Sequence, residues 1–343
     1  IGPAVLRGIR VLEQGTFITG PCAGMMLADL GADVIKVESP DGDPYRAYQE
    51  GQYSPHFQAY NRNKRSLCLD LKQGGDRELF NELVREADVY IQNFRPGTAE
   101  RLGASAEELQ RINPRLVYCS ISGFGSSGPY VDRPSYDSVA QALSGFLSVV
   151  VDPERPRFLG PALADAITGI YAAYGVLGAL FERTRTGQGH VVEVSMLEAM
   201  AHFAVEPFAA FFALGDVPKS SDRPRLAQAH ILHTADGALL AIHLSSLEKF
   251  WTGRVAALDD PGIASDPRFA TRLLRIDNYE ALGTELDRRF RTRPAEEWAE
   301  RLRANDVPFA PINSVDAVVK DPQVRHLGLV VPVDRPHTAT EAV

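Results

Sequence analysis

The chain has 343 residues, of which 45% are hydrophobic and 23% charged, and its formal net charge at pH 7 is −8. This composition is typical of a globular protein of about two domains and excludes a disordered or fibrous chain. The acidic balance argues against a general nucleic-acid-binding protein, because such proteins carry a basic face. The longest apolar stretches, 170–181 and 203–214, are shorter than the ~20 residues of a membrane span, so we expect no membrane association.

The three cysteines, Cys22, Cys68 and Cys119, lie far apart in the sequence. Their odd number and wide spacing fit neither a disulfide framework nor a cysteine-rich zinc site, and indicate a reducing compartment. No charged-then-apolar leader opens the sequence, so we expect a cytoplasmic protein.

The first third of the chain alternates predicted strands with predicted helices. A first β–α–β unit is predicted at 10–38, with Pro21 in the first turn of its helix and Gly31 at that helix's C-terminal cap. The predicted strands lie at 10–13, 32–38, 66–71, 88–92 and 115–121, with further helices at 75–86 and 107–112. This alternation predicts an α/β fold, with a Rossmann-like parallel sheet covered by helices on both faces.

Ligands of such sheets bind outside the carboxyl ends of the strands, which here lead into loops 14–20, 93–97 and 123–137. Loop 14–20 (QGTFITG) is not G-x-G-x-x-G, so the sequence gives little support to a nicotinamide dehydrogenase, although the loop is compatible with a phosphate-contacting turn. The run 123–128 (GFGSSG) lacks the G-x-S-x-G spacing and does not support an α/β-hydrolase.

The rest of the chain predicts a second, smaller α+β domain. A hairpin at 229–244 turns at Asp236-Gly237, which is a strong turn signal. The other predicted elements are helices at 162–183 and 196–214, a strand at 189–195, and helices at 247–258, 278–290 and 294–305. The predicted organisation is a large domain at 1–215, a linker at 216–228, a small domain at 229–313 and a final segment at 314–343.

The sequence gives no sign of a metal site. His230 and His233 are the closest of the histidines, but a spacing of three on a strand places them on opposite faces. The cations of the first third are more suggestive. Singly they suit a solvated surface, but as a set on loops they are compatible with a local basic pocket. They are Lys36, Arg46, Arg62, Lys64, Arg65, Lys72, Arg95 and Arg101.

Asp165 stands near the start of the long apolar helix at 162–183 and allows two interpretations. It is a favoured type of helix N-cap, or it is a carboxylate held at the positive helix end as a nucleophile. With an ordinary pKa near ~3.9, the carboxyl of Asp165 is ionised at pH 7 but is a weak nucleophile in water. A dry site and a good leaving group such as a thiolate would make it effective. Spacing alone leaves both interpretations open.

Beyond these local patterns, the sequence resembles the class III CoA-transferases, which include formyl-CoA, carnitine and dicarboxylate CoA-transferases, with α-methylacyl-CoA racemases as relatives. The matching segments occur in order at 7–38, 61–72, 88–103, 113–129, 135–145, 160–169, 186–199, 236–237 and 307–312. Several linked motifs are more specific than any one of them. The resemblance implies a Rossmann-like CoA-binding domain and a homodimer of interlocked chains, with 314–343 as the start of a segment that returns to the first domain.

The resemblance also implies the chemistry. Asp165 would attack a donor acyl-CoA, pass through a mixed anhydride and an aspartyl-CoA thioester, and deliver CoA to a carboxylic acid without a permanently bound cofactor. Each tetrahedral step needs donors to its oxyanion, and backbone N–H groups at 160–166 are available for this. The positions that the resemblance assigns to CoA binding are Ile18, Thr19, Leu69, Lys72, Asn93, Phe94, Arg95, Arg101, Tyr136 and Asp137.

Departures from the family pattern narrow the function. Formyl-CoA transferases carry a glycine-rich run where 224–234 has none, so we do not expect oxalate and formate as substrates, and they carry an arginine where Ser39 stands. The absence of the glycine run favours a mid-sized acid, such as a dicarboxylate, as the acceptor. Racemases have a histidine at the position where this chain has Tyr136. The ordinary pKa of a tyrosine hydroxyl is near ~10, so Tyr136 would be a poor base, which argues against a racemase. An isomerase that moves CoA within one molecule would use the same residues, and a non-catalytic CoA-binding protein is the remaining alternative.

Overall fold

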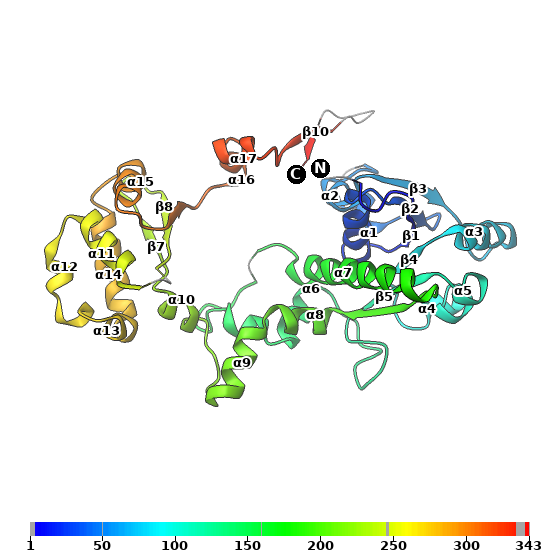
Figure 1. Cartoon of the computed structure of the whole chain (residues 1–343), viewed down its shortest axis with the longest axis horizontal. Helices are drawn as coiled ribbons and strands as arrows, with labels where there is room; N and C mark the ends of the chain where they lie inside the picture. Colours follow the sequence, from blue (N-terminus) through cyan, green and yellow to red (C-terminus); the bar gives the residue numbers. More distant parts are fainter. Residues whose placement is uncertain (1–3, 50, 159, 245–246, 334–339, 343) are drawn as a thin grey trace. The chain divides into compact units, whose positions relative to one another are not determined.

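The structure is a computed structural model and describes residues 4–49, 51–158, 160–244, 247–333 and 340–342. The chain divides into two compact units, Ile1–Pro218 and Lys219–Val343. Figure 1 traces the elements of both units in chain order. The first unit holds a parallel sheet and the second a smaller antiparallel sheet, which confirms the predicted α/β class.

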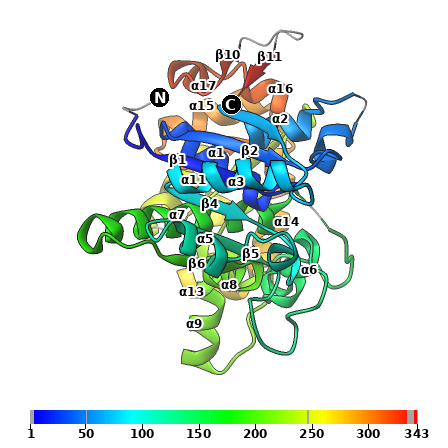
Figure 2. The ribbon, with the colours of Figure 1, turned by 90° about the vertical axis from the view of Figure 1, so that its right-hand side faces the viewer.

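The sheet of the first unit has six strands in the order β3-β2-β1-β4-β5-β6, and all neighbouring pairs are parallel. The strands are β1 (Arg10–Gln14), β2 (Asp33–Glu38), β3 (Lys64–Cys68), β4 (Val89–Gln92), β5 (Val117–Ser122) and β6 (Val191–Ser195). Figure 2 shows β1 and β4 side by side in the middle of the sheet. Because the strand order reverses between them, their carboxyl ends form the crevice where sheets of this kind bind ligands.

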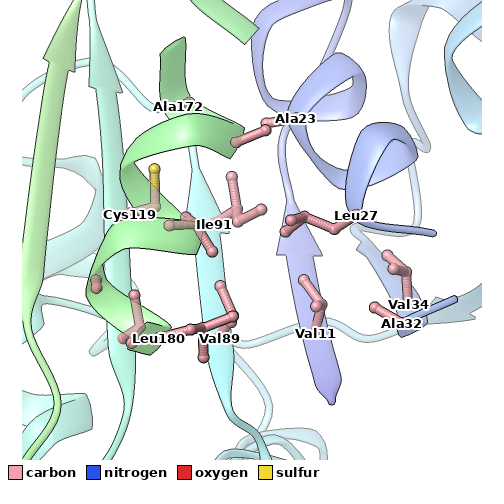
Figure 3. Close-up of a cluster of buried hydrophobic side chains, with 14 of the residues drawn as sticks. Val11, Ala23, Leu27, Ala32, Val34, Val89, Ile91, Cys119, Ala172 and Leu180 are labelled. Atoms are coloured by element: carbon pink, nitrogen blue, oxygen red, sulfur yellow. The ribbon is translucent and has the colours of Figure 1, made fainter. Parts of the chain in front are cut away.

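Helices cover both faces of this sheet, as its strand sequences predict. On one face lie α1 (Thr19–Asp29) and α7 (Leu163–Thr186); the other carries α3 (Gly74–Glu86) and α5 (Ala106–Ile112). Successive β1 side chains alternate between the two faces, with Val11 in one core and Leu12 in the other. Figure 3 shows the first core, where Ala23 and Leu27 of α1 and Ala172 and Leu180 of α7 meet side chains of the strands.

Helices α1 and α7 cross closely, and this crossing positions the start of α7. A Cβ on Gly169 would lie 2.6 Å from the Cβ of Cys22, so only glycine fits at this point of α7. The crossing therefore places the first turn of α7 beside the loop between β1 and α1.

Two expectations about the apolar segments are wrong, namely that each is shorter than a membrane span and that 196–214 forms a single helix. Helix α7 has 24 residues and is long and apolar enough to cross a membrane, although half of its apolar window is buried within the protein. The single helix expected at 196–214 is two helices, α8 (Met196–Phe203) and α9 (Val205–Leu214), with a bend of 65° between them.

The second unit contains the expected hairpin, formed by β7 (His230–His233) and β8 (Leu239–Ile242), with β9 (Phe309–Pro311) beside β8. Its helices α11 (Leu247–Leu258), α14 (Tyr279–Phe290) and α15 (Ala295–Ala304) lie close to the predicted ranges. His230 is buried and His233 is exposed, so they face opposite sides of β7. The expected linker is partly helical, as α10 (Asp222–Ala227).

Short elements near the crevice were not predicted. They are α2 (Pro55–Asn61), α4 (Thr98–Arg101) and α6 (Asp137–Leu143). The expected strand at 66–71 is also displaced, because β3 begins at Lys64 and ends at Cys68. These differences matter because α4 and α6 both follow the carboxyl ends of central strands.

Candidate active site

A buried ion-pair network lies under the loop that follows β1. The Nζ of Lys36 lies 3.4 Å from Glu13 Oε1 and 3.0 Å from Asp43 Oδ2, and the Nζ of Lys64 lies 3.0 Å from Glu13 Oε2. Burial would raise the pKa of the Glu13 carboxyl, but the charges of the two lysines outweigh this effect and hold the pKa below its usual value. The network also fixes Gly15, whose N–H donates to Glu13 at 2.6 Å and whose carbonyl accepts from Lys36 at 2.7 Å.

Most of the cations noted in the first third of the sequence are paired within the first unit. Five of them contact carboxylates: Lys36 and Lys64 as above, Arg46 with Glu38, Arg62 with Asp29, and Arg65 with Asp33. The charges of these five cations are therefore balanced within the protein. Among the described residues, no carboxylate pairs with Lys72, Arg95 or Arg101, so these three keep their charge available for an anion.

Asn93, at the end of β4, braces the loop after β1 across the crevice. Its Oδ1 accepts the N–H of Thr16 at 2.9 Å, and its Nδ2 donates to the Thr16 carbonyl and to Thr19 Oγ1, both at 2.8 Å. Both amide hydrogens are thus used inside the protein. The Asn93 side chain positions the loop and has no hydrogen left to donate to a ligand.

Asp165 is the third residue of α7, whose N-cap is Ala162, so the N-cap interpretation is wrong. Asp137, the first residue of α6, supplies the cap instead. Its Oδ1 accepts the N–H of Ala164 at 2.7 Å and that of Asp165 at 3.3 Å. Because the N–H of Ala166 donates to the Ala162 carbonyl, none of these three N–H groups is free for an oxyanion.

The carboxyl of Asp165 is partly buried, and the negative charge of Asp137 lies close to it. Burial raises its pKa from the usual 3.8 to about 7, and the charge of Asp137 adds to the effect. The group therefore changes protonation near neutral pH, and is not fully ionised there as expected from its ordinary pKa. No described residue hydrogen-bonds to its side-chain oxygens. A carboxyl perturbed in this way inside a cleft is a candidate for a functional role.

Two adjoining cavities occupy the crevice. One of about 260 Å³ contains Asp165, and one of about 340 Å³ lies at the ends of β2 and β3. Thr16 and Phe94 line both cavities. Of the expected residues, the smaller cavity is lined by Ile18, Thr19, Asn93, Phe94, Arg95, Tyr136 and Asp165, and the larger by Leu69, Lys72 and Phe94.

Two expected residues lie outside the cavity walls. Asp137 acts through the helix cap described above, and Arg101 donates to Thr98 Oγ1 at 2.7 Å on α4. Conversely, Phe17 and Arg133 line the smaller cavity without having been singled out. Arg133 lies in the third crevice loop and could have been found there, whereas nothing in the sequence indicates the unusual backbone of Phe17.

Within the described ranges, no group of three or more His, Cys, Asp or Glu side chains could hold a metal.

Comparison with known proteins gives consistent matches along the whole chain. The model of CoA-transferase family III matches residues 6–343. The acetyl-CoA:oxalate CoA-transferase of Acetobacter aceti is 34% identical over 94% of this chain and 85% of its own. The succinate–glutarate CoA-transferase of Agrobacterium fabrum is 35% identical over 96% of this chain and 85% of its own.

Solved structures agree in fold. A CAIB/BAIF family protein from Brucella suis has a TM-score of 0.85 and 34% identity, covering 97% of this chain and 93% of that one. Rv3272 from M. tuberculosis has a TM-score of 0.87 and 31% identity, covering 100% and 92%.

Proposed function

The chain belongs to CoA-transferase family III and is an enzyme of that class, and we propose that Asp165 is the nucleophile of its CoA transfer. One observation carries the proposal. Asp165 is the one acidic residue among the described residues that line the smaller cavity, and its pKa of about 7 reflects a weakly hydrated carboxyl. A carboxylate that has lost most of its hydration attacks a thioester more readily than one in water.

The proposed reaction passes through two covalent intermediates on Asp165. The Asp165 carboxylate attacks the thioester carbonyl of the donor acyl-CoA, and the carbon–sulfur bond breaks to give a mixed anhydride and CoA thiolate. The thiolate attacks the aspartyl carbonyl and displaces the donor acid, which leaves an aspartyl-CoA thioester. The acceptor carboxylate then attacks this thioester, and the same steps in reverse regenerate Asp165 and form the new acyl-CoA. The covalent intermediates divide one difficult transfer into easier ones.

The two cavities suit the two parts of CoA. We place the adenosine in the larger cavity, at Leu69 and Lys72, and the pantetheine in the smaller one, past Tyr136 to Asp165. Arg95 and Arg101 supply positive charge for the phosphates, because guanidinium groups bind phosphate oxygens well. Ile18 and Thr19, at the start of α1, line the smaller cavity.

The proposal is tested with Asp165→Ala. The variant should lose acyl transfer while keeping its affinity for CoA, and Asp216→Ala, at an exposed carboxylate, is the matched control and should keep full activity. Incubation with acyl-CoA followed by hydroxylamine should modify Asp165 in the unaltered protein. Unchanged turnover of Asp165→Ala would exclude the nucleophile role. Rapid α-proton exchange of a 2-methylacyl-CoA in deuterated water without acyl transfer would point to a racemase instead.

The acceptor is a dicarboxylate in this proposal. The relatives are named for oxalate, glutarate, citramalate and mesaconate, all of which carry two carboxylates. A panel of mono- and dicarboxylic acids with succinyl-CoA or acetyl-CoA as donor identifies the acceptor, and a clear preference for monocarboxylates would contradict the assignment.

We also propose that the enzyme is a cytoplasmic homodimer. All three cysteines are free, as in a reducing compartment. Large apolar side chains are exposed on α7 and α9, among them Tyr174 at 74% and Phe212 at 80%, and such a surface suits a protein–protein contact. Light scattering should give twice the chain mass of 37.5 kDa, and a monomer at micromolar concentration would contradict this.

A further inference from the structure

Phe17 has a backbone conformation that is unusual for its side chain. Its φ is +60°, in the left-handed region that bulky residues rarely adopt. The other described non-glycine residues with positive φ are all polar: Asn63, Gln228, Asp259 and Asp306. A strained residue of this kind persists only where its surroundings force it, and such residues gather at functional sites.

The surroundings of Phe17 do force this conformation. Its N–H donates to Asp43 Oδ1 at 3.1 Å, and Asp43 is 2% exposed and ion-paired to Lys36. The preceding residue, Thr16, is held at both its N–H and its carbonyl by Asn93. These contacts hold the chain on the N-terminal side of Phe17, and the hydrogen bond from Asn93 Nδ2 to Thr19 Oγ1 holds it on the C-terminal side.

The strain directs an aromatic ring to the reaction site. The ring of Phe17 lies edge-on to Tyr45, with centroids 5.3 Å apart, and to Tyr136, with centroids 6.3 Å apart. Phe17 lines the same cavity as Asp165. After burial, the charge of Asp165 is the next largest cause that raises the pKa of Tyr45 to about 12, so this neighbour of Phe17 also lies close to the carboxyl. Phe17 and Tyr136 thus form an aromatic wall of the cavity that contains Asp165, and Tyr45 packs against Phe17.

We propose that Phe17 shields the aspartyl-CoA thioester from water and so makes the enzyme choose a carboxylate acceptor over hydrolysis. The inference rests on the proposed function of Asp165. In the competing reaction, water adds to the aspartyl carbonyl and the carbon–sulfur bond breaks. The sulfur takes a proton from the water, and Asp165 returns as a carboxylic acid, so acyl-CoA is converted to free acid and CoA. Because water is in large molar excess over any acceptor, transfer requires that water be kept out.

Phe17→Gly removes the ring and relieves the backbone strain at the same time. Asp259→Gly is the matched control, because it gives the same backbone relief at an exposed position of the second unit. The experiment measures CoA release without acceptor and CoA transfer with acceptor. In Phe17→Gly we expect the ratio of hydrolysis to transfer to rise at least about tenfold, because water now reaches the thioester. The ratio is measured at saturating acyl-CoA, so that a change in CoA affinity does not affect it.

Further variants keep the test decisive. Phe17→Tyr retains the ring and should retain the ratio of the unaltered protein. Tyr136→Ala removes the supporting ring from a position that is 61% exposed, so the protein should fold and show a smaller rise in the same ratio. In Phe17→Gly the acid limb of the pH–rate profile should also move to lower pH, since hydration of Asp165 favours its charged form.

The outcomes separate the two proposals. An unchanged ratio in folded Phe17→Gly, with normal transfer by the unaltered protein, would overturn the role of Phe17 and leave Asp165 as nucleophile. If Phe17→Gly does not fold, an unchanged ratio in Tyr136→Ala would overturn it instead. If the unaltered protein neither forms a covalent adduct at Asp165 nor transfers CoA to any acid, both proposals fail together. A rise of equal size in Asp259→Gly would assign the effect to backbone relief and overturn the shielding role.

Discussion

The Oδ1 of Asp137 accepts the backbone N–H of Asp165 at 3.3 Å, and that of the preceding Ala164 at 2.7 Å. The carboxylate that caps α7 thus lies beside the carboxyl that we propose as nucleophile. The cap fixes the first turn of the helix, while the charge adds to the burial that raises the pKa of Asp165 to about 7. Asparagine at position 137 would separate these two effects, because it keeps the acceptor oxygen and removes the charge.

In Asp137→Asn we therefore expect the midpoint of the acid limb of kcat/KM to move to lower pH, but not back to the usual range of an aspartate, because burial, the larger cause, remains. The nucleophile is the deprotonated form, so activity is lost as the pH falls through this midpoint. A pH–rate profile with saturating acceptor measures the shift. Asp137→Ala also removes the cap, and should lower thermal stability as well. A midpoint that does not move in Asp137→Asn would show that the charge of Asp137 does not reach Asp165.

Asp165→Asn should make the protein more stable as it makes it inactive. The raised pKa means that the folded state binds a proton at Asp165 more tightly than the unfolded state, where the pKa is near 3.8. Ionised Asp165 therefore costs folding free energy that appears as pH rises from about 4 to 7, and we expect the variant to gain about 2–4 kcal/mol at pH 8. Denaturant unfolding at pH 8 and at pH 4 checks this, and the gain should vanish at pH 4. An equal gain at both values would assign the effect to something other than ionisation.

Lys36→Met should destabilise the first unit strongly. Lys36 is 1% exposed, and its loss leaves Asp43 buried without its cation, which typically costs about 3–5 kcal/mol. Arg65→Met removes an ion pair whose partners are 66% and 49% exposed, so this control should cost about 0–1 kcal/mol. Chemical denaturation compares the two variants, and similar losses would contradict the role given to the buried network.

Asn93→Ala should raise KM for acyl-CoA and lower stability, because the N–H and carbonyl of Thr16 lose their partner at the crevice. Groups left unpaired in this way cost about 1–3 kcal/mol. Thr19→Val removes one of the three hydrogen bonds and should give a smaller effect in the same direction. If Asn93→Ala raised KM with no change in stability, the side chain would act as a direct ligand and not as a brace.

Arg95→Gln and Arg101→Gln should each weaken CoA binding, and the loss should shrink as salt concentration rises, since added salt screens the charge that each variant removes. Calorimetric titration with CoA at two ionic strengths tests the assignment. Because Arg101 lies outside both cavity walls, unaltered binding in Arg101→Gln alone would remove it from the CoA site and leave Arg95 in place.

The sheet was predictable because its causes are local. In the first unit, apolar strands such as β4 alternate with helices of clear period, and in the second unit Asp236-Gly237 marks the turn between β7 and β8 without help from the rest of the chain. The bend between α8 and α9 at Ala204 has a local signal that the prediction overlooked, because Pro207 has no N–H to donate to the Phe203 carbonyl and its ring disfavours a continuous helix there.

The site was predictable in its outline and not in its connections. Resemblance gave the position of Asp165, but the cap from Asp137 joins residues far apart in sequence and has no local signal. The same is true of the partners of Lys36 and Lys64, which a list of charges cannot distinguish from surface lysines. The left-handed backbone of Phe17 is imposed by Asp43 and appears only when the fold brings the two together.

The neighbouring position of β1 and β4 also bears on how this protein can change over evolutionary time. The cavity that contains Asp165 opens at the carboxyl ends of these central strands, whereas β3 and β6 form the margins of the sheet. Substitutions or insertions at the amino ends of β3 and β6 alter the scaffold without moving the reacting groups, but any lengthening of the loops after β1 and β4 would pull these loops apart. We therefore expect homologues to vary in length at the amino ends of the outer strands and to conserve the spacing at the inner pair.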